Sequence, residues 1–341
     1  MFRLILRAAV RRSLRDVRHV RPVAPRAARG TTATLYRRLE REFGVLAPPV
    51  ALLAPAPECA AATWTLLRES LLVPGRTQRS TREAMATAVS RDNSCPYCVE
   101  VHGATLDSLD STGEGPSTSG DLTERAELGA VALTFQHINR LVNVFLPESP
   151  LPGFAPMAVH GTLRRATGAV IAAGDGRARS GPPLDLLPEA ARGAPLPEDL
   201  GWAAEAPRIR SALAAATLTI DAAGEGVLPL TVRNMLHRHL EEHGVGPAGI
   251  SRAWVEEVVR DLPRDDRPLG RLVLLTARAS YQVDGGTIAG CRELGVDDPA
   301  LVRIVSWAAM TAARHAPIPT AGEGPEHAHS HTPQENKRKP T

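Results

Sequence analysis

Four residues between positions 83 and 102 have the types and the spacing that thiol redox chemistry needs. Cys95 and Cys98 form a Cys-x-x-Cys pair. His102 follows the second cysteine by four residues, and Glu83 precedes the first by twelve. Thiolates are stabilised at the start of a helix, and an imidazole four residues on shares the face of the second thiol. A carboxylate against that imidazole would orient the ring and raise its basicity. The set predicts a proton relay from carboxylate to imidazole to thiol, with a second thiol one turn away to close a disulfide.

Two helices must bring these side chains together. A residue of the stretch 93–95 can cap a helix over about 95–108. Pro96 suits the first turn of that helix, because its missing N–H group needs no partner there. The preceding residues, about 80–91, are rich in Ala and Met without alternation, which indicates a second helix. If the two helices run antiparallel, the carboxylate comes against the imidazole.

Other interpretations of the same residues stay open. Glu83 also fits a capping box with Ser80, which would need no chemistry. His102 on its own is more typical of a hydrogen-bonded core or surface histidine than of a base. The pattern Cys-x-x-Cys-x-x-x-His could supply three ligands of a structural zinc, although no second pair follows nearby to complete the site. Cys-Pro-Tyr-Cys is also the motif of glutaredoxins, but there it follows a β-strand, and here helix precedes it.

The spacing Glu-x11-Cys-x2-Cys-x3-His resembles the signature of the alkylhydroperoxidase D-like branch of the carboxymuconolactone decarboxylase family. The resemblance covers about residues 60–146, including the stretch from His137 to Arg140. It implies an all-α, oligomeric protein that reduces peroxides through the cysteine pair. His137 is a further candidate for the active site, and a buried hydrogen-bonded histidine is the alternative. The decarboxylase branch does not rely on a cysteine pair, so a lactone decarboxylase is the weaker expectation.

The resemblance also implies a role for each residue of the motif. Cys98 would be the peroxidatic cysteine and Cys95 the resolving cysteine. His102 would be the base, keeping the attacking sulfur as thiolate, and Glu83 the carboxylate that completes the relay. Some family members carry a histidine between the cysteines; here Tyr97 takes that place and could donate a hydrogen bond. From the residues alone the order of attack stays open, because the helix dipole favours Cys95 while the spacing to His102 favours Cys98.

Positive charge is concentrated at the N-terminus. Residues 1–30 contain nine arginines and one aspartate, whereas all 341 residues together carry a formal net charge of +3. On a helix, the residues Leu6, Val10, Leu14 and Val17 would form one apolar stripe with arginines beside it. That pattern is typical of an arm that touches a membrane surface or nucleic acid. We expect instead a disordered extension or a surface helix, and no nucleic-acid partner.

Cysteine usage indicates a reducing compartment. Besides the close pair, the chain has only Cys59 and Cys291, which stand alone in apolar helical contexts and should be buried and inert. One close pair and two single cysteines do not make the disulfide framework of a secreted domain. The chain has no run of about 20 uncharged apolar residues, so we expect no membrane span. These features predict a cytoplasmic protein.

Composition divides the chain into five parts. We expect a basic extension over 1–30, an alkylhydroperoxidase D-like domain with the cysteine pair over 31–146, and a Pro- and Gly-rich connection over 147–198. A second helical half follows over 199–315, and a disordered tail over 316–341. The fold class expected is an all-α bundle of two tandem repeats, the second one degenerate.

The prediction of a repeat comes from the end of the second half. Residues 271–294 followed by 299–315 resemble a motif helix pair and its covering helix. At the cysteine positions this second copy has Val283 and Gly286, and Gly290 stands where the histidine would be. We expect the second half to keep the packing and to have lost the chemistry.

These observations predict a thiol-dependent peroxidase. Its partners would be a small-molecule peroxide, an external dithiol reductant and further copies of the chain, with no cofactor and no metal. The alternatives are a thiol–disulfide carrier or sensor without peroxidase turnover, a protein in which the pair holds zinc, and the lyase named above.

Overall fold

The computed structural model describes residues 2–110, 121–150, 157–173, 178, 184–246 and 249–318. All regular elements in these ranges are helices, and no β-strand occurs among them, which confirms the all-α fold class. The Gly- and Ser-rich loop at 111–120 and the expected tail from 319 onward lie outside the described residues.

The first half is built from eight α-helices and three short helical turns. They are α1 (Phe2–Ser13), η1 (Leu14–Asp16), α2 (Gly30–Arg38), η2 (Leu39–Phe43), α3 (Pro48–Ala51), α4 (Pro57–Leu67), η3 (Arg68–Leu72), α5 (Arg79–Asp92), α6 (Pro96–Asp110), α7 (Leu122–Phe145) and α8 (Met157–Ala172). Several ends follow the sequence signals. Pro96 is the first residue of α6, and Asp121 caps α7 by accepting a hydrogen bond from the Glu124 N–H group. Gly44, at φ 100°, ends η2 in a conformation that glycine adopts readily.

The second half contains six α-helices and further short turns. They are η4 (Leu184–Leu186), η5 (Glu189–Ala191), η6 (Glu198–Ala203), α9 (Pro207–Glu225), α10 (Leu230–His243), α11 (Ala253–Val259), η7 (Arg264–Asp266), α12 (Arg267–Arg278), η8 (Ser280–Gln282), α13 (Gly285–Glu293) and α14 (Asp298–His315). Two stretches of this half are divided into separate helices. The stretch 199–222 is interrupted before Pro207, which restricts the residue ahead of it. The stretch 267–294 is interrupted before α13, because the Asp284 side chain caps a new helix there.

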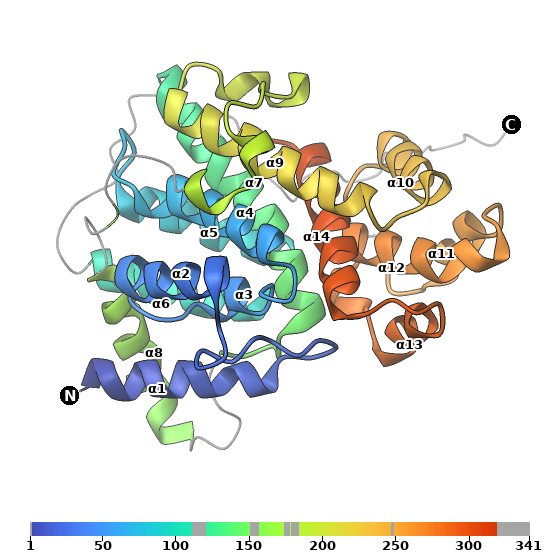
Figure 1. The fold of residues 1–341 in the computed structure, drawn as a ribbon. Coiled ribbons are helices and arrows are strands. Elements are labelled where there is room, and N and C mark those ends of the chain that lie inside the picture. The colour runs from blue at the N-terminus through green and yellow to red at the C-terminus, as the bar shows by residue number, and fades with distance from the viewer. Residues whose placement is uncertain are drawn as a thin grey trace, which may run out of the picture.

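Four helices form the centre of the molecule. α7 packs against α14, and α4 packs against α9, so the two halves share one core (Figure 1). Alanine occupies many buried positions in α4, α9 and α14, which lets these helices approach closely. Trp64, Phe135 and Phe145 are the largest fully buried side chains. In Figure 1 the first half is coloured blue to green, and the second half is coloured yellow to red.

The N-terminal segment, expected to be a disordered extension or a surface helix, forms α1 and η1. Leu6 and Leu14 are buried, and Val10 packs against the core. Arg7 donates to the carbonyl of Gly44 at 2.9 Å, and Arg11 donates both of its bonds to the Glu40 carboxylate. The apolar stripe predicted from the sequence therefore packs against the rest of the protein. Among the described residues, no helix is long and apolar enough to cross a membrane.

Candidate active site

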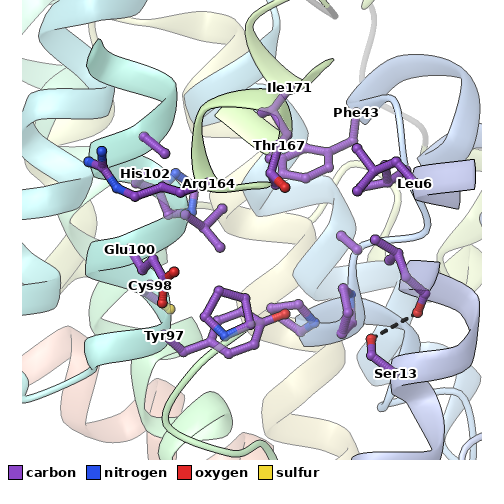
Figure 2. Close-up of a pocket in the computed structure, with 18 of the residues that line it drawn as sticks. Leu6, Ser13, Phe43, Tyr97, Cys98, Glu100, His102, Arg164, Thr167 and Ile171 are labelled. Carbon is purple, nitrogen blue, oxygen red and sulfur yellow. Dashed lines mark hydrogen bonds between the residues drawn. The ribbon is translucent and has the colours of Figure 1, made fainter. Parts of the chain in front are cut away.

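An apolar cavity of about 110 Å³ lies where α6 faces α1 and α8 (Figure 2). Cys98 and His102 line it from α6, and most other lining side chains are apolar. Further parts of the wall come from α1, α7 and α8 and from the end of η2 and the segment after it. The lining residues include Leu6, Val10, Phe43, Phe135, Ile138 and Ile171. A thiol and an imidazole thus open on one partly enclosed space with a largely apolar lining.

Glu83 contacts His102 as the sequence predicted. The carboxylate is fully buried, and its Oε2 atom lies 2.7 Å from Nδ1 of His102. Its other oxygen accepts bonds from Nε and Nη2 of Arg79 at 2.9 Å and 2.5 Å. The capping box is absent, because Ser80 lies inside α5 and its hydroxyl has no hydrogen-bond partner among the described residues. The Glu83 carboxylate therefore binds Arg79 and His102 between α5 and α6 and does not cap a helix.

The charge state of Glu83 fixes the tautomer of His102. Burial alone would raise the pKa of Glu83, but the guanidinium of Arg79 and the ring of His102 outweigh it and lower the pKa to about 2. An ionised carboxylate only accepts hydrogen bonds, so Nδ1 of His102 carries the proton. The ring also stands edge-on to Phe135, with centroids 4.6 Å apart. Nε2 bonds to none of the described residues, and it is the nitrogen left for a molecule in the cavity.

The two cysteines differ in their access to the cavity. Both are reduced and buried, with Cys95 0% and Cys98 2% exposed. Cys98 lines the cavity and Cys95 does not. Burial, followed by the hydrogen bond and charge of Cys95, raises the pKa of Cys98 well above its usual value. No hydrogen bond joins His102 to either thiol within the described residues. The resting thiolate expected from the sequence is therefore disfavoured in this arrangement.

The two supporting candidates lie in different places. Tyr97 lines the cavity beside Cys98, and burial raises its pKa, so the phenol stays protonated and can donate a hydrogen bond. His137 is fully buried in α7 and is not among the residues that line the cavity. Its Nε2 atom pairs with the Thr63 hydroxyl at 3.1 Å, and burial together with the charge of Arg140 lowers its pKa to about 3. Tyr97 thus lies in the lining of the cavity, whereas His137 lies in the core.

Three features of the site were not predicted from the sequence. Arg79 lies one helical turn before Glu83, a spacing that could have suggested the pairing. Arg164 of α8 lines the cavity and pairs with Asp107 at 2.6 Å. That α1 covers the cavity could not be predicted, because an amphipathic pattern shows that a helix has an apolar face but does not show what that face packs against.

The zinc interpretation has no support in the geometry. In the part of the chain that the structure describes, no group of three or more His, Cys, Asp or Glu side chains is arranged to hold a metal ion. The fold and the site thus define an all-α protein in which a buried vicinal dithiol opens, beside a Glu–His pair, on an apolar cavity.

Comparison with known proteins places the chain in a family. No family model matches it, and no solved structure matches it. An alkyl hydroperoxide reductase of Mycobacterium tuberculosis is 34% identical to it over 317 residues, which cover 84% of this chain and 90% of that protein. The chain belongs to the alkylhydroperoxidase D-like family, as the resemblance of its motif implied.

Proposed function

We propose that the chain is a thiol-dependent peroxidase that reduces organic hydroperoxides through Cys98 and Cys95. The observation that carries the proposal is the shared cavity, which Cys98 and His102 both line while buried Glu83 holds the far side of the imidazole. The name of the Mycobacterium tuberculosis relative supports the same class of reaction. Within this proposal the chain acts in the cytoplasm as a homo-oligomer.

In the first step, the Cys98 thiol gives its proton to Nε2 of His102 as the hydroperoxide enters. The thiolate is the nucleophile, and it attacks the terminal oxygen of R–O–OH. The O–O bond breaks, Cys98 becomes a sulfenic acid, and the leaving alkoxide takes the proton from His102 to give the alcohol R–OH. Ionised Glu83 stabilises the imidazolium that exists between the two proton transfers.

In the second step, Cys95 resolves the sulfenic acid. Its thiol attacks the Cys98 sulfur, a disulfide forms, and the hydroxyl leaves as water with the proton of Cys95. An external dithiol then supplies two electrons and two protons to restore both thiols. Cys98 is the better candidate for the attacking residue, because a molecule in the cavity reaches it and does not reach Cys95.

The lining of the cavity favours a peroxide with an apolar group. Transfer of an alkyl group from water to apolar surface gains roughly 25 cal/mol per Å² buried, whereas hydrogen peroxide gains nothing comparable. The enclosed position of both thiols argues against a carrier that exchanges disulfides with large protein partners, since neither sulfur is exposed to them.

Peroxide consumption, coupled to several dithiol donors, tests the proposal. Cys98→Ser should lower turnover on the order of a thousandfold. Cys95→Ser should keep one round of attack and leave a sulfenic acid on Cys98 that a dimedone-type probe labels. Cys291→Ser is the matched control and should change nothing, because burial raises the pKa of Cys291 to about 11 and keeps it inert.

Two results would contradict the proposal. Dimedone labelling of the Cys98→Ser variant would show that Cys95 attacks first. Disulfide exchange with dithiols, with no consumption of any hydroperoxide, would make the chain a redox carrier instead.

A further inference from the structure

The turn between α5 and α6 determines where Cys95 stands. Cys98 lies inside the first turn of α6, whereas Cys95 lies just before Pro96, at the end of the turn. Ser94 adopts a left-handed backbone with φ 50°, which is unusual for a residue other than glycine. The N–H group of Cys95 then donates to the carbonyl of Ser90 at 2.9 Å. The position of the first sulfur therefore depends on how this turn is held.

Two asparagines on one face of α7 hold the turn. Asn139 is fully buried, and its side-chain oxygen accepts a bond from the Ser90 hydroxyl at 3.2 Å. Asn143, one helical turn further on, donates its amide to the backbone carbonyl of Asn93 at 3.1 Å. The two contacts bracket the stretch that leads into Cys95.

The second half of the chain takes part in the same contact. The amide of Asn143 also donates to the hydroxyl of Ser280 at 3.0 Å, and Ser280 is the first residue of η8. Nearby, Arg140 donates from its Nε atom to the carbonyl of Ala277 at 2.8 Å, which fixes the end of α12 on α7. Ser280 is 5% exposed and Asn143 is half-buried, so the bond between them is partly shielded from water. A chain of contacts thus runs from the second half through Asn143 to the redox turn.

We propose that Asn143 and Ser280 are positioning residues for disulfide closure, and that the second half serves the site by holding Cys95 in reach of Cys98. The inference rests on the proposed function. A disulfide requires Cα atoms about 4.4–6.8 Å apart and a narrow range of dihedral angles, so closure is sensitive to the turn. Attack on peroxide uses Cys98, His102 and Glu83, which all stand within helices. The contacts of Asn143 should therefore affect closure and leave attack unchanged.

Single-turnover oxidation of the full-length protein separates the two steps. One equivalent of an organic hydroperoxide is added, and the sulfenic acid and the disulfide are quantified over time by mass spectrometry with and without dimedone. In Asn143→Ala, closure should be about tenfold slower than in the unaltered chain, since the partly buried hydrogen bond that holds the turn is lost. Ser280→Ala should slow closure in the same direction by a smaller factor. The rate at which Cys98 forms sulfenic acid should stay the same in both.

Three controls distinguish positioning from general destabilisation. Ser280→Thr keeps the hydroxyl and should restore the closure rate. Ser211→Ala removes an exposed hydroxyl elsewhere in the second half and should have no effect. Closure driven by diamide, an oxidant that needs no peroxide chemistry, tests the positioning even if the chain proves not to be a peroxidase.

Closure that is equally fast in Asn143→Ala and in the unaltered chain, with either oxidant, overturns the inference. A variant in which attack and closure slow by the same factor overturns it as well, because that pattern belongs to a residue that only stabilises the fold. Failure of the unaltered chain to form any sulfenic acid, with normal diamide closure, counts against the proposed function and not against the positioning.

Discussion

The helices α5, α6 and α7 of the first half and α12, α13 and α14 of the second half share one arrangement. α5 packs on α6 and on α7, and α12 packs on α13 and on α14 (Figure 1). The long helices α7 and α14 then pack against each other. The break between α12 and α13 stands where the repeat interpretation needs a turn. These correspondences support the prediction of a tandem repeat, which stays a prediction.

The two sets of helices differ at the positions that carry chemistry. The second has Val283 and Gly286 at the places of the cysteines, and Gly290 at the place of the imidazole. Twelve residues before Val283, where a carboxylate would stand, is Arg271, and it pairs on the surface with Glu256. If the second set is a repeat, it has kept the helix packing of the first set without the residues of the motif. Glu83, fully buried between Arg79 and His102, thus has no counterpart at the matching position of the second set.

The surroundings of the equivalent helices differ as well. α6 is covered by α8 and α1, which enclose the cavity. The first turn of α13 is exposed to solvent at Gly285 and Gly286. The reactivity of the first half should therefore depend on the covering of α6 by α8 and α1 and on the Glu–His pair as much as on the cysteines.

Among changes that compare the two halves, the largest expected effect comes from removing the buried carboxylate. Glu83→Gln should slow peroxide attack by about a hundredfold, because an amide neither stabilises the imidazolium nor fixes the proton on Nδ1. Single-turnover loss of the Cys98 thiol measures the effect. Arg271→Gln is the matched change in the second half, and it should leave the rate unaltered and shift stability by less than about 0.5 kcal/mol. Equal rates in the two variants would show that the Glu–His pair takes no part in catalysis.

A smaller effect, a loss of stability at acidic pH, is also expected in the first half only. The pKa of Glu83 is lowered from 4.5 to about 2, so ionised Glu83 stabilises the folded chain above pH 4.5. That contribution, about 3 kcal/mol, should be lost as the pH falls from 4.5 towards 2. Asp284 at the start of α13 also has a lowered pKa, because the Thr287 N–H group and Arg252 bond to it, but this carboxylate is half exposed and screened.

Hydrogen exchange at several acidic pH values checks this difference. Protection of α5 and α6 should fall at a higher pH than protection of α12 and α13. The Glu83→Gln variant should lose this pH dependence. Simultaneous loss of protection in both halves of the unaltered chain would mean that Glu83 does not stabilise the first half locally.

Local signals in the sequence were sufficient for most helix boundaries and for the core of the site. Asp121, Pro96 and Gly44 mark helix ends by chemistry that acts within a few residues. The contact between Glu83 and His102 was predictable because both lie on consecutive helices with a known spacing. The contact of Asn143 with Ser280 spans 137 residues, and no local pattern encodes it.

The smallest effect is expected where the motif is grafted onto the second half. V283C/G286C, made together with Cys95→Ser and Cys98→Ser, places a cysteine pair at the start of α13. Diamide should close this pair, since the spacing at a helix start is that of Cys95 and Cys98. Organic hydroperoxide should oxidise it no faster than it oxidises a small free dithiol, because Gly290 offers no imidazole and solvent reaches the turn. Thiol loss is measured against that free dithiol. A grafted pair that reached a tenth of the native rate would show that two cysteines at a helix start are sufficient, and that the cavity and the Glu–His pair add little.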